Sequence, residues 1–191
     1  MLMRVRVARL LVVSAVAACA AGSAQPGDAL TRDGFWSLVD ATTSAGAVPD
    51  RAALLTQELR SRSTATLESY QTWLVRVVAE LDRRALQDVA GVVCPGLDDG
   101  AFTDVRSWLV AQGRAVVERV TSDPVAFAGL PGVRASCDDS GEPFGDAAVA
   151  LYSDRGLEPG SAAFPLVDTG GATGPAATPE QLRRARAALR P

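Results

Sequence analysis

Two adjacent carboxylates, Asp98 and Asp99, are the residues of this chain whose type and spacing come nearest to a chemical site. With Gly100 they could form half of a carboxylate pair, or they could supply oxygen ligands to Ca²⁺. The calcium-loop pattern is not matched, because its alternating acidic positions and its distal glutamate are missing. The favoured interpretation is structural: one aspartate caps the helix that follows, and the other interacts favourably with the helix dipole. We predict no metal ion and no cofactor for this chain.

Three more polar side chains follow these aspartates on the same stretch. They could line a pocket that binds an anion or a peptide, or they could form internal pairs with acids of the same helix. The sequence leaves both alternatives open, and we assign no catalytic residue. The candidate binding residues are Asp98, Asp99, Arg106, Gln112 and Arg114.

The absence of histidine restricts the chemistry further. It excludes the common Ser-His-Asp and Cys-His nucleophile systems, the commonest zinc ligand and the usual general base near neutral pH. Catalysis would have to use carboxylates, tyrosine, arginine or an activated serine. The 19 basic residues, all arginine, are outnumbered by 22 acidic residues, which gives a formal net charge of −3. An acidic chain argues against a nucleic-acid partner, since the main attraction of such proteins is to phosphate.

The start of the chain has the layout of a bacterial export signal. A basic segment precedes nine apolar residues (10–18), and this run is too short to cross a bilayer, which takes about 20 residues. The sequence Val16-Ala17-Ala18-Cys19 is similar to a lipobox, so we expect residues 1–18 to be removed and Cys19 to carry a lipid. The alternative is ordinary signal cleavage, which would remove residues 1–24 and Cys19 with them.

Cys94 and Cys137 lie in the part of the chain that would be exported. In an oxidising compartment an even pair of cysteines favours a disulfide over a metal or redox site. A Cys94–Cys137 bond would close a loop of about 44 residues and would stabilise the fold by roughly 4 kcal/mol in the chain-entropy model. The alternative is a pair of buried thiols.

The elements that must position these residues are predicted to be helices. Apolar residues recur at three- and four-residue steps, most clearly at Leu67, Tyr70, Leu74, Val77 and Leu81, and the alternation typical of strands is absent. We therefore predict one all-α domain of about six to eight helices over residues 31–156.

Shorter segments are expected on both sides of this domain. Residues 20–30 are small and polar and predict a flexible tether. Residues 157–177 are rich in Gly, Pro and Ala and are expected to be irregular or mobile. The last segment, 178–191, begins with the capping-box pattern Thr178-Pro179-Glu180-Gln181 and predicts a short helix with a basic face.

Two stretches within the helical region resemble a known family. The opening Phe35-Trp36-Ser37-Leu38-Val39-Asp40 and the block Cys94–Phe127 are similar to motifs of the bacterial family called domain of unknown function 4240. In the block, an Asp-Asp-Gly element leads into an Arg-x-Trp-Leu-x-x-Gln-Gly-Arg helix and then an Asp-Pro turn. The resemblance extends over residues 33–156, and it implies a helical fold and no known activity. The matching positions are Asp98, Asp99, Gly100, Phe102, Arg106, Trp108, Leu109, Gln112, Gly113 and Arg114.

The chain also departs from the family pattern. Ala115 replaces the usual acid after Arg114, and Cys94 lies two residues further from the aspartate pair than the pattern implies. Family members commonly look cytoplasmic, whereas this chain carries an export signal. Because the family motif includes a cysteine like Cys94, a pair of inherited thiols stays open as the alternative to the disulfide.

These observations favour an extracytoplasmic, lipid-anchored protein that acts as a binding or interaction module. Its expected partners are the cell membrane, through the anchor, and an unknown protein or small ligand; without the anchor the protein would be secreted. The alternative is a histidine-free, carboxylate-dependent enzyme that uses Asp98 or Asp99 with Arg106 or Arg114. Such an enzyme requires these groups to converge on one concave pocket. A third possibility, a subunit of a protein complex, has no sequence feature for or against it.

Overall fold

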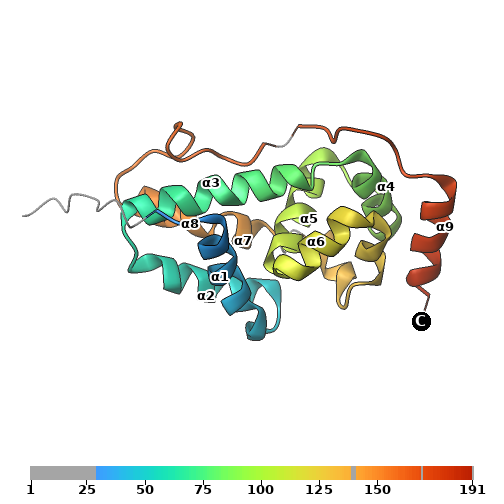
Figure 1. Cartoon of the computed structure of the whole chain (residues 1–191), viewed down its shortest axis with the longest axis horizontal. Coiled ribbons are helices and arrows are strands. Elements are labelled where there is room, and N and C mark those ends of the chain that lie inside the picture. The colour runs from blue at the N-terminus through green and yellow to red at the C-terminus, as the bar shows by residue number, and fades with distance from the viewer. Residues whose placement is uncertain (1–28, 139–140, 169, 191) are drawn as a thin grey trace, which may run out of the picture.

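The computed structural model describes residues 29–138, 141–168 and 170–190. The predicted signal peptide, Cys19 and most of the predicted tether lie outside the described residues. In chain order the described part contains the following α-helices and 3₁₀ helices (Figure 1): α1 (Arg32–Thr42), η1 (Thr43–Ala45), α2 (Val48–Arg60), α3 (Thr64–Glu80), α4 (Arg84–Val93), α5 (Asp99–Ala111), α6 (Arg114–Ser122), η2 (Pro124–Gly129), η3 (Val133–Cys137), α7 (Glu142–Gly145), α8 (Ala147–Asp154) and α9 (Pro179–Ala188).

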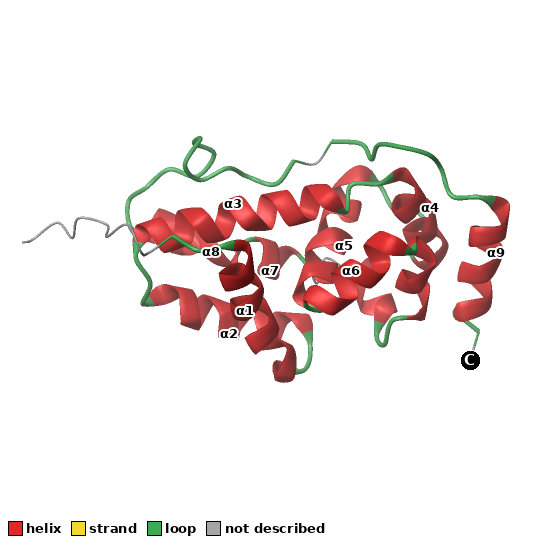
Figure 2. Cartoon of the chain, in the orientation of Figure 1, coloured by secondary structure: helices red, strands yellow, loops and turns green. Residues whose placement is uncertain are grey.

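The fold class is all-α, as the periodicity predicts. Figure 2 shows helices joined by loops, and the described residues contain no β-strand. An isolated bridge between Arg83 and Thr173 is the one strand-like pairing in the described part. No helix in this part is long and apolar enough to span a bilayer.

Capping side chains fix the start of several helices. Thr31 accepts a hydrogen bond from the backbone at the start of α1, and Ser63 does the same for α3. Asp98 accepts from the backbone N–H of Ala101 at 2.8 Å, which confirms its predicted role as the cap of α5. The predicted capping box of α9 is also present, with reciprocal bonds between Thr178 and Gln181.

Helix α5 is the central element of the domain. It contacts α1, α2, α3, α4, α6, α7 and η3, and nine of its 13 residues are buried. A helix surrounded in this way is expected to be apolar on all sides. Three of the buried residues of α5 are nevertheless polar: Thr103, Arg106 and Ser107. A buried polar group without a partner costs free energy, so these three side chains are expected to find partners on the elements packed around α5.

A segment without helix, residues 157–177, runs back along α3 and carries the chain to α9 (Figure 1); we call it the strap. Phe164 anchors it, because this side chain is fully buried and its ring stacks on Tyr152 with centroids 4.0 Å apart. Further along, the Arg84 backbone N–H donates to the Thr173 carbonyl at 2.7 Å, which produces the isolated bridge. The strap is therefore irregular in secondary structure but held by specific contacts.

Helix α9 packs on α4 and η2 at the end of the strap. Its Ala185 is fully buried, and its Arg184 forms an ion pair with Asp123 at 2.8 Å. Arg183 and Arg186 are exposed, as expected of a basic outer face.

Candidate functional site

The two aspartates of the candidate binding set have structural partners. Asp98 caps α5, as described above. Asp99 accepts a hydrogen bond from the Gln87 side-chain amide at 2.7 Å, which links α5 to α4. Among the described residues, no group of acids, histidines and cysteines is arranged to hold a metal ion.

Arg106 is the most deeply buried charged residue of the set, with 1% of its surface exposed. Its guanidinium donates to the Thr103 hydroxyl at 2.7 Å and to the Asp168 carbonyl of the strap at 3.0 Å. A second nitrogen forms an ion pair with Asp82 at 3.2 Å, and the guanidinium carbon lies 5.1 Å from the ring centroid of Phe102. Burial lowers the pKa of Arg106, while the negative charges of Asp82, Asp168 and Asp99 oppose that shift. The arginine thus ties α5 to the strap.

Gln112 connects the end of α5 to α2. Its amide donates to the Trp108 carbonyl at 3.2 Å and accepts from Arg51 at 3.1 Å. Arg51 also donates to the carbonyls of Ala111 and Gly46, so it closes the end of α5 against the turn before α2. Burial lowers the pKa of Arg51. The Gln112 side chain is therefore part of an internal network.

Arg114 joins the two family-like motifs. Its backbone N–H donates to the Asp40 carboxylate at 2.9 Å, and its guanidinium pairs with Asp33 and Glu118, both at 2.8 Å. These hydrogen bonds raise the pKa of the exposed Arg114. Gly113 has a φ of +95°, and a Cβ there would lie 2.7 Å from the Asp40 carboxylate oxygen. Glycine is thus required where Asp40, from α1, approaches the start of α6.

The five candidate residues do not converge on one pocket. Each forms the contacts just described, which spread from the α4–α5 junction to the start of α6. Of the five, Gln112 alone lines a described hollow, a mostly apolar one of about 230 Å³ beside Trp108. The alternative of internal pairing therefore matches the geometry of all five side chains.

A different set of polar residues surrounds a hollow between α3, α5, α7 and the strap. We call it the acidic hollow, and its volume is about 250 Å³. Three carboxylates line it, together with a buried amide and two buried hydroxyls; the apolar Val149, Leu166 and Val167 complete the wall. The polar lining consists of Gln71, Thr103, Asp104, Ser107, Glu142 and Asp146.

Gln71, which lines the acidic hollow, has a polar atom without a partner. Gln71 is 1% exposed, and its side-chain nitrogen donates to the Pro165 carbonyl of the strap at 3.0 Å. Because a carbonyl can only accept, this bond fixes the orientation of the amide. The Gln71 Oε1 is buried and accepts no hydrogen bond. An unsatisfied buried acceptor costs about 1–3 kcal/mol relative to a satisfied one.

The rim of the acidic hollow is negatively charged. Glu142 and Asp146, from the ends of the short helix α7, are exposed, and partial burial raises the pKa of Asp146. Neither carboxylate has an ion-pair partner in the described part of the chain, and no arginine lines the hollow. Asp104 differs, since it makes an interaction of its own.

The acidic hollow depends on a close approach of the chain to α5. A Cβ on Gly141 would overlap the carbonyl oxygen of Asp104, so only glycine fits where α7 begins. Four positions later, at the last residue of α7, a Cβ on Gly145 would lie 3.0 Å from the Ser107 hydroxyl oxygen. Two glycines thus allow α7 to bring its carboxylates against the polar residues of α5.

Sequence reasoning missed this site. One signal was available: Gln71 is flanked by Leu67 and Leu74 at helical spacing, so a polar residue lies on the apolar stripe of α3. Glu142 and Asp146 carried no such signal, because nothing local places α7 beside α3 and α5.

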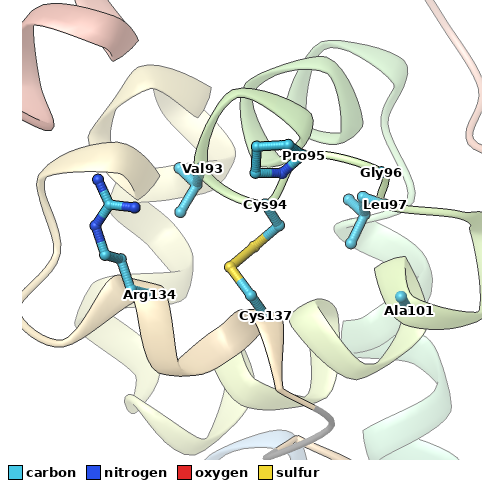
Figure 3. A pocket seen from close by; sticks show the side chains of 8 residues that line it. All are labelled: Val93, Cys94, Pro95, Gly96, Leu97, Ala101, Arg134 and Cys137. Atoms are coloured by element: carbon cyan, nitrogen blue, oxygen red, sulfur yellow. A yellow bond between two sulfur atoms is a disulfide. The ribbon is translucent and has the colours of Figure 1, made fainter.

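A second hollow, of about 330 Å³, borders the disulfide (Figure 3). Cys94 and Cys137 are bonded in the structure, with Cα atoms 5.4 Å apart, as the cysteine count predicts. Arg134 and Leu97 lie on opposite sides of the sulfur atoms in Figure 3. This hollow contains one charged side chain and no described buried atom that lacks a partner, so it offers a ligand less than the acidic hollow does.

Comparison with known proteins bears on the fold and not on the chemistry. No curated protein and no solved structure matches the chain. Residues 30–154 match the family described as "Protein of unknown function (DUF4240)", and this range contains both motifs that meet at Arg114 and the helices that surround the acidic hollow. The match covers well over half of the chain, so the protein belongs to the DUF4240 family.

Proposed function

We propose that this protein is an extracytoplasmic binding module, held at the membrane by a lipid on Cys19, and that its ligand occupies the acidic hollow. The lipobox-like sequence Val16-Ala17-Ala18-Cys19 supports the location, and the Cys94–Cys137 disulfide is consistent with an oxidising compartment. The polar floor and charged rim of the hollow support the binding role.

One observation carries the choice of site: of the five buried side-chain atoms without a hydrogen-bond partner in the described part of the chain, only the Oε1 of Gln71 belongs to a residue that lines a described hollow. Natural proteins satisfy nearly all buried polar atoms, and each exception calls for an explanation. Here the side chain is fixed by its bond to Pro165, so the oxygen cannot turn to find another partner. A ligand that donates to this oxygen would remove the cost of leaving it unsatisfied.

A binding role fits the geometry better than catalysis by the predicted residues. Asp98 and Asp99 hold α5 in place, Arg106 holds the strap, and Arg114 holds α1 against α6. A catalytic set requires its groups to converge on one concave site, and these side chains have separate structural roles.

The binding role can be tested by fragment screening on the processed chain purified from membranes. We expect saturable binding of polar fragments, detected by ligand-observed NMR. Gln71→Met keeps the size of the side chain and removes the acceptor, so it should weaken binding about fivefold, the value of one ordinary hydrogen bond. Gln57→Met, on the exposed face of α2, is the matched control and should leave the affinity unchanged. Fragments that bind equally to wild type and Gln71→Met would contradict the site.

The location can be tested separately by intact-mass analysis of membrane-extracted protein. We expect a diacylglyceryl mass on Cys19 and a gain of two hydrogen atoms when the added reductant converts the disulfide to two thiols. A mature N-terminus at Gln25 would contradict the anchor, and free thiols before reduction would contradict the bridge.

A further inference from the structure

The lining of the acidic hollow restricts the chemistry of its ligand. We propose that the hollow binds a small organic cation whose charged group carries N–H donors, a primary ammonium in the simplest case. This inference rests on the proposed binding function and specifies its ligand class.

The negative charge of the lining favours a cationic ligand. Three carboxylates and no arginine line the hollow, and Arg106, which precedes the lining residue Ser107, contacts Asp82 and the strap instead. Glu142 and Asp146 have no cationic partner among the described residues. An anion would meet only like charges here, whereas a cation would neutralise an acidic rim that the chain leaves unpaired.

The hydrogen-bonding capacity of the lining favours a ligand with several donors. Ionised carboxylates accept and cannot donate, and the free atom of Gln71 is an oxygen that also only accepts. The Thr103 hydroxyl is already occupied, since it donates to the Asp99 carbonyl and accepts from Arg106. The Ser107 hydroxyl can donate as well as accept, but the other available polar atoms of the lining are acceptors. A ligand that satisfies them must supply several donors, as an ammonium does and a quaternary amine does not.

The size and the apolar wall of the hollow favour a small ligand with an alkyl chain. A volume of about 250 Å³ suits a few non-hydrogen atoms and is below the usual range for drug-sized ligands. Leu166 on the strap is 52% exposed, the highest exposure among the large apolar side chains of the described residues, and it lines the hollow together with Val149 and Val167. An alkyl chain attached to the ammonium would cover this apolar surface.

A series of four probes that share a four-carbon chain tests the ligand class on the processed full chain. The probes are n-butylammonium, n-butyltrimethylammonium, n-butanol and butyrate, titrated separately with ligand-observed NMR. We expect n-butylammonium to bind at least tenfold more tightly than each of the other three. The n-butyltrimethylammonium probe tests the need for N–H donors, butanol the need for charge, and butyrate the sign of the charge.

Variants of the rim locate the binding. The double variant Glu142→Gln and Asp146→Asn should weaken n-butylammonium binding by about three- to tenfold, because each exposed ion pair contributes modestly. Asp154→Asn is the matched control, since it removes an exposed carboxylate from α8, outside the hollow lining. Circular dichroism of each variant reports that the fold is retained.

The outcomes separate this inference from the proposed function. Binding of butanol or butyrate that is as tight as that of butylammonium, and sensitive to Gln71→Met, would overturn the ligand class and leave the binding function intact. Butylammonium binding that the double variant does not weaken would also overturn the inference. If neither these probes nor a broad fragment set binds in the hollow, both the inference and the proposed function fail.

Discussion

Two clusters of polar residues lie around α5, and they differ in how far their charged and polar groups are paired within the chain. The Arg106 cluster comprises Arg106, Thr103, Asp82 and the Asp168 carbonyl, and its charge is neutralised within the chain. The acidic hollow has a buried acceptor and two rim carboxylates that the chain leaves unpaired. Thr103 belongs to both clusters, and the strap contacts both, at Asp168 and at Pro165.

The difference concerns what each cluster is available to do. Arg106 is nearly inaccessible to solvent, and the negative charges of Asp82, Asp168 and Asp99 compensate its positive charge. Its role is therefore structural, since it holds α5 to the strap. Gln71 is equally buried, and each of the two residues has one buried atom without a hydrogen-bond partner, Arg106 Nε and Gln71 Oε1; only Gln71 lines a described hollow. Burial and an unpartnered atom therefore do not identify a functional polar residue by themselves; the residue must also line a space that a ligand can enter.

The strap should have the largest effect on both clusters, since each uses one of its carbonyls. Phe164→Ala removes a fully buried ring that stacks on Tyr152, and we expect a loss of about 3–5 kcal/mol in the free energy of unfolding. Urea denaturation measures this loss, and hydrogen exchange should show reduced protection in residues 160–173. Leu157→Ala, at an exposed position of the strap, should change stability by less than about 1 kcal/mol. Equal effects of the two variants would show that Phe164 does not anchor the strap.

Arg106→Met should break the paired cluster and leave the hollow's rim in place. The substitution leaves Asp82 and the Asp168 carbonyl without their donor, so we expect a loss of about 3 kcal/mol. Arg119→Met, at an exposed position on α6, is the control and should stay within about 0.5 kcal/mol of wild type. Denaturation midpoints compare the two variants. A near-neutral Arg106→Met would mean that the cluster contributes little net stability.

Gln71→Met should behave in the opposite way to Arg106→Met. It loses the bond to Pro165 but also removes the unsatisfied oxygen, so the net change in stability should be below about 1 kcal/mol. Thermal denaturation without ligand is the measurement. A loss in the free energy of unfolding as large as that of Arg106→Met would indicate that Gln71, like the arginine, mainly holds the strap in place. The distinction between the two clusters would then be wrong.

Asp146→Asn should have the smallest effect and the most informative pH dependence. Partial burial raises the pKa of Asp146 in the folded protein above its ordinary value of 3.8, so folding disfavours the ionised form. The variant should therefore be slightly more stable than wild type at pH 7, where the carboxylate is ionised. This advantage should shrink as the pH falls through the folded pKa and should vanish below about 3.8.

Unfolding curves at pH 7 and pH 3.5 measure the effect of Asp146→Asn, with Asp154→Asn as the comparison for loss of an exposed charge from the neighbouring helix. Lower stability of Asp146→Asn at pH 7 would show that the carboxylate has a stabilising partner. A stability gain at neutral pH combined with weaker ammonium binding would indicate a carboxylate kept for a ligand rather than for the fold.

The sequence predicted much of the fold because the relevant signals are local. The apolar stripe of α3, the cap Asp98 and the capping box at Thr178 all involve residues three or four positions apart. Such signals depend on backbone geometry and hold wherever the helix packs. The two family-like motifs also indicated the helical domain, and the match over residues 30–154 confirms that resemblance.

The candidate site could not be predicted in the same way. The polar residues of α5 were visible, but their partners were not: Arg106 meets the Asp168 carbonyl across 62 positions, and Arg114 meets Asp33 across 81. Whether a polar residue braces the fold or faces a ligand depends on those distant partners. The five candidate residues have internal partners that local sequence signals do not identify, and the acidic hollow is formed by residues outside that predicted set, such as Gln71, Glu142 and Asp146.

By itself the sequence determined the all-α class, several helix starts and the pairing of Cys94 with Cys137. Helical periodicity and capping arise from interactions within a few residues, and two cysteines in the predicted exported region allow one internal pairing. Only the tertiary structure decided where unpaired acceptors remain, since Gln71 is brought to Asp146 and to Pro165 of the strap across 75 and 94 positions of the chain. Whether a buried polar atom lacks a hydrogen-bond partner is a property of the packed fold, because it depends on which distant residues pack around that atom.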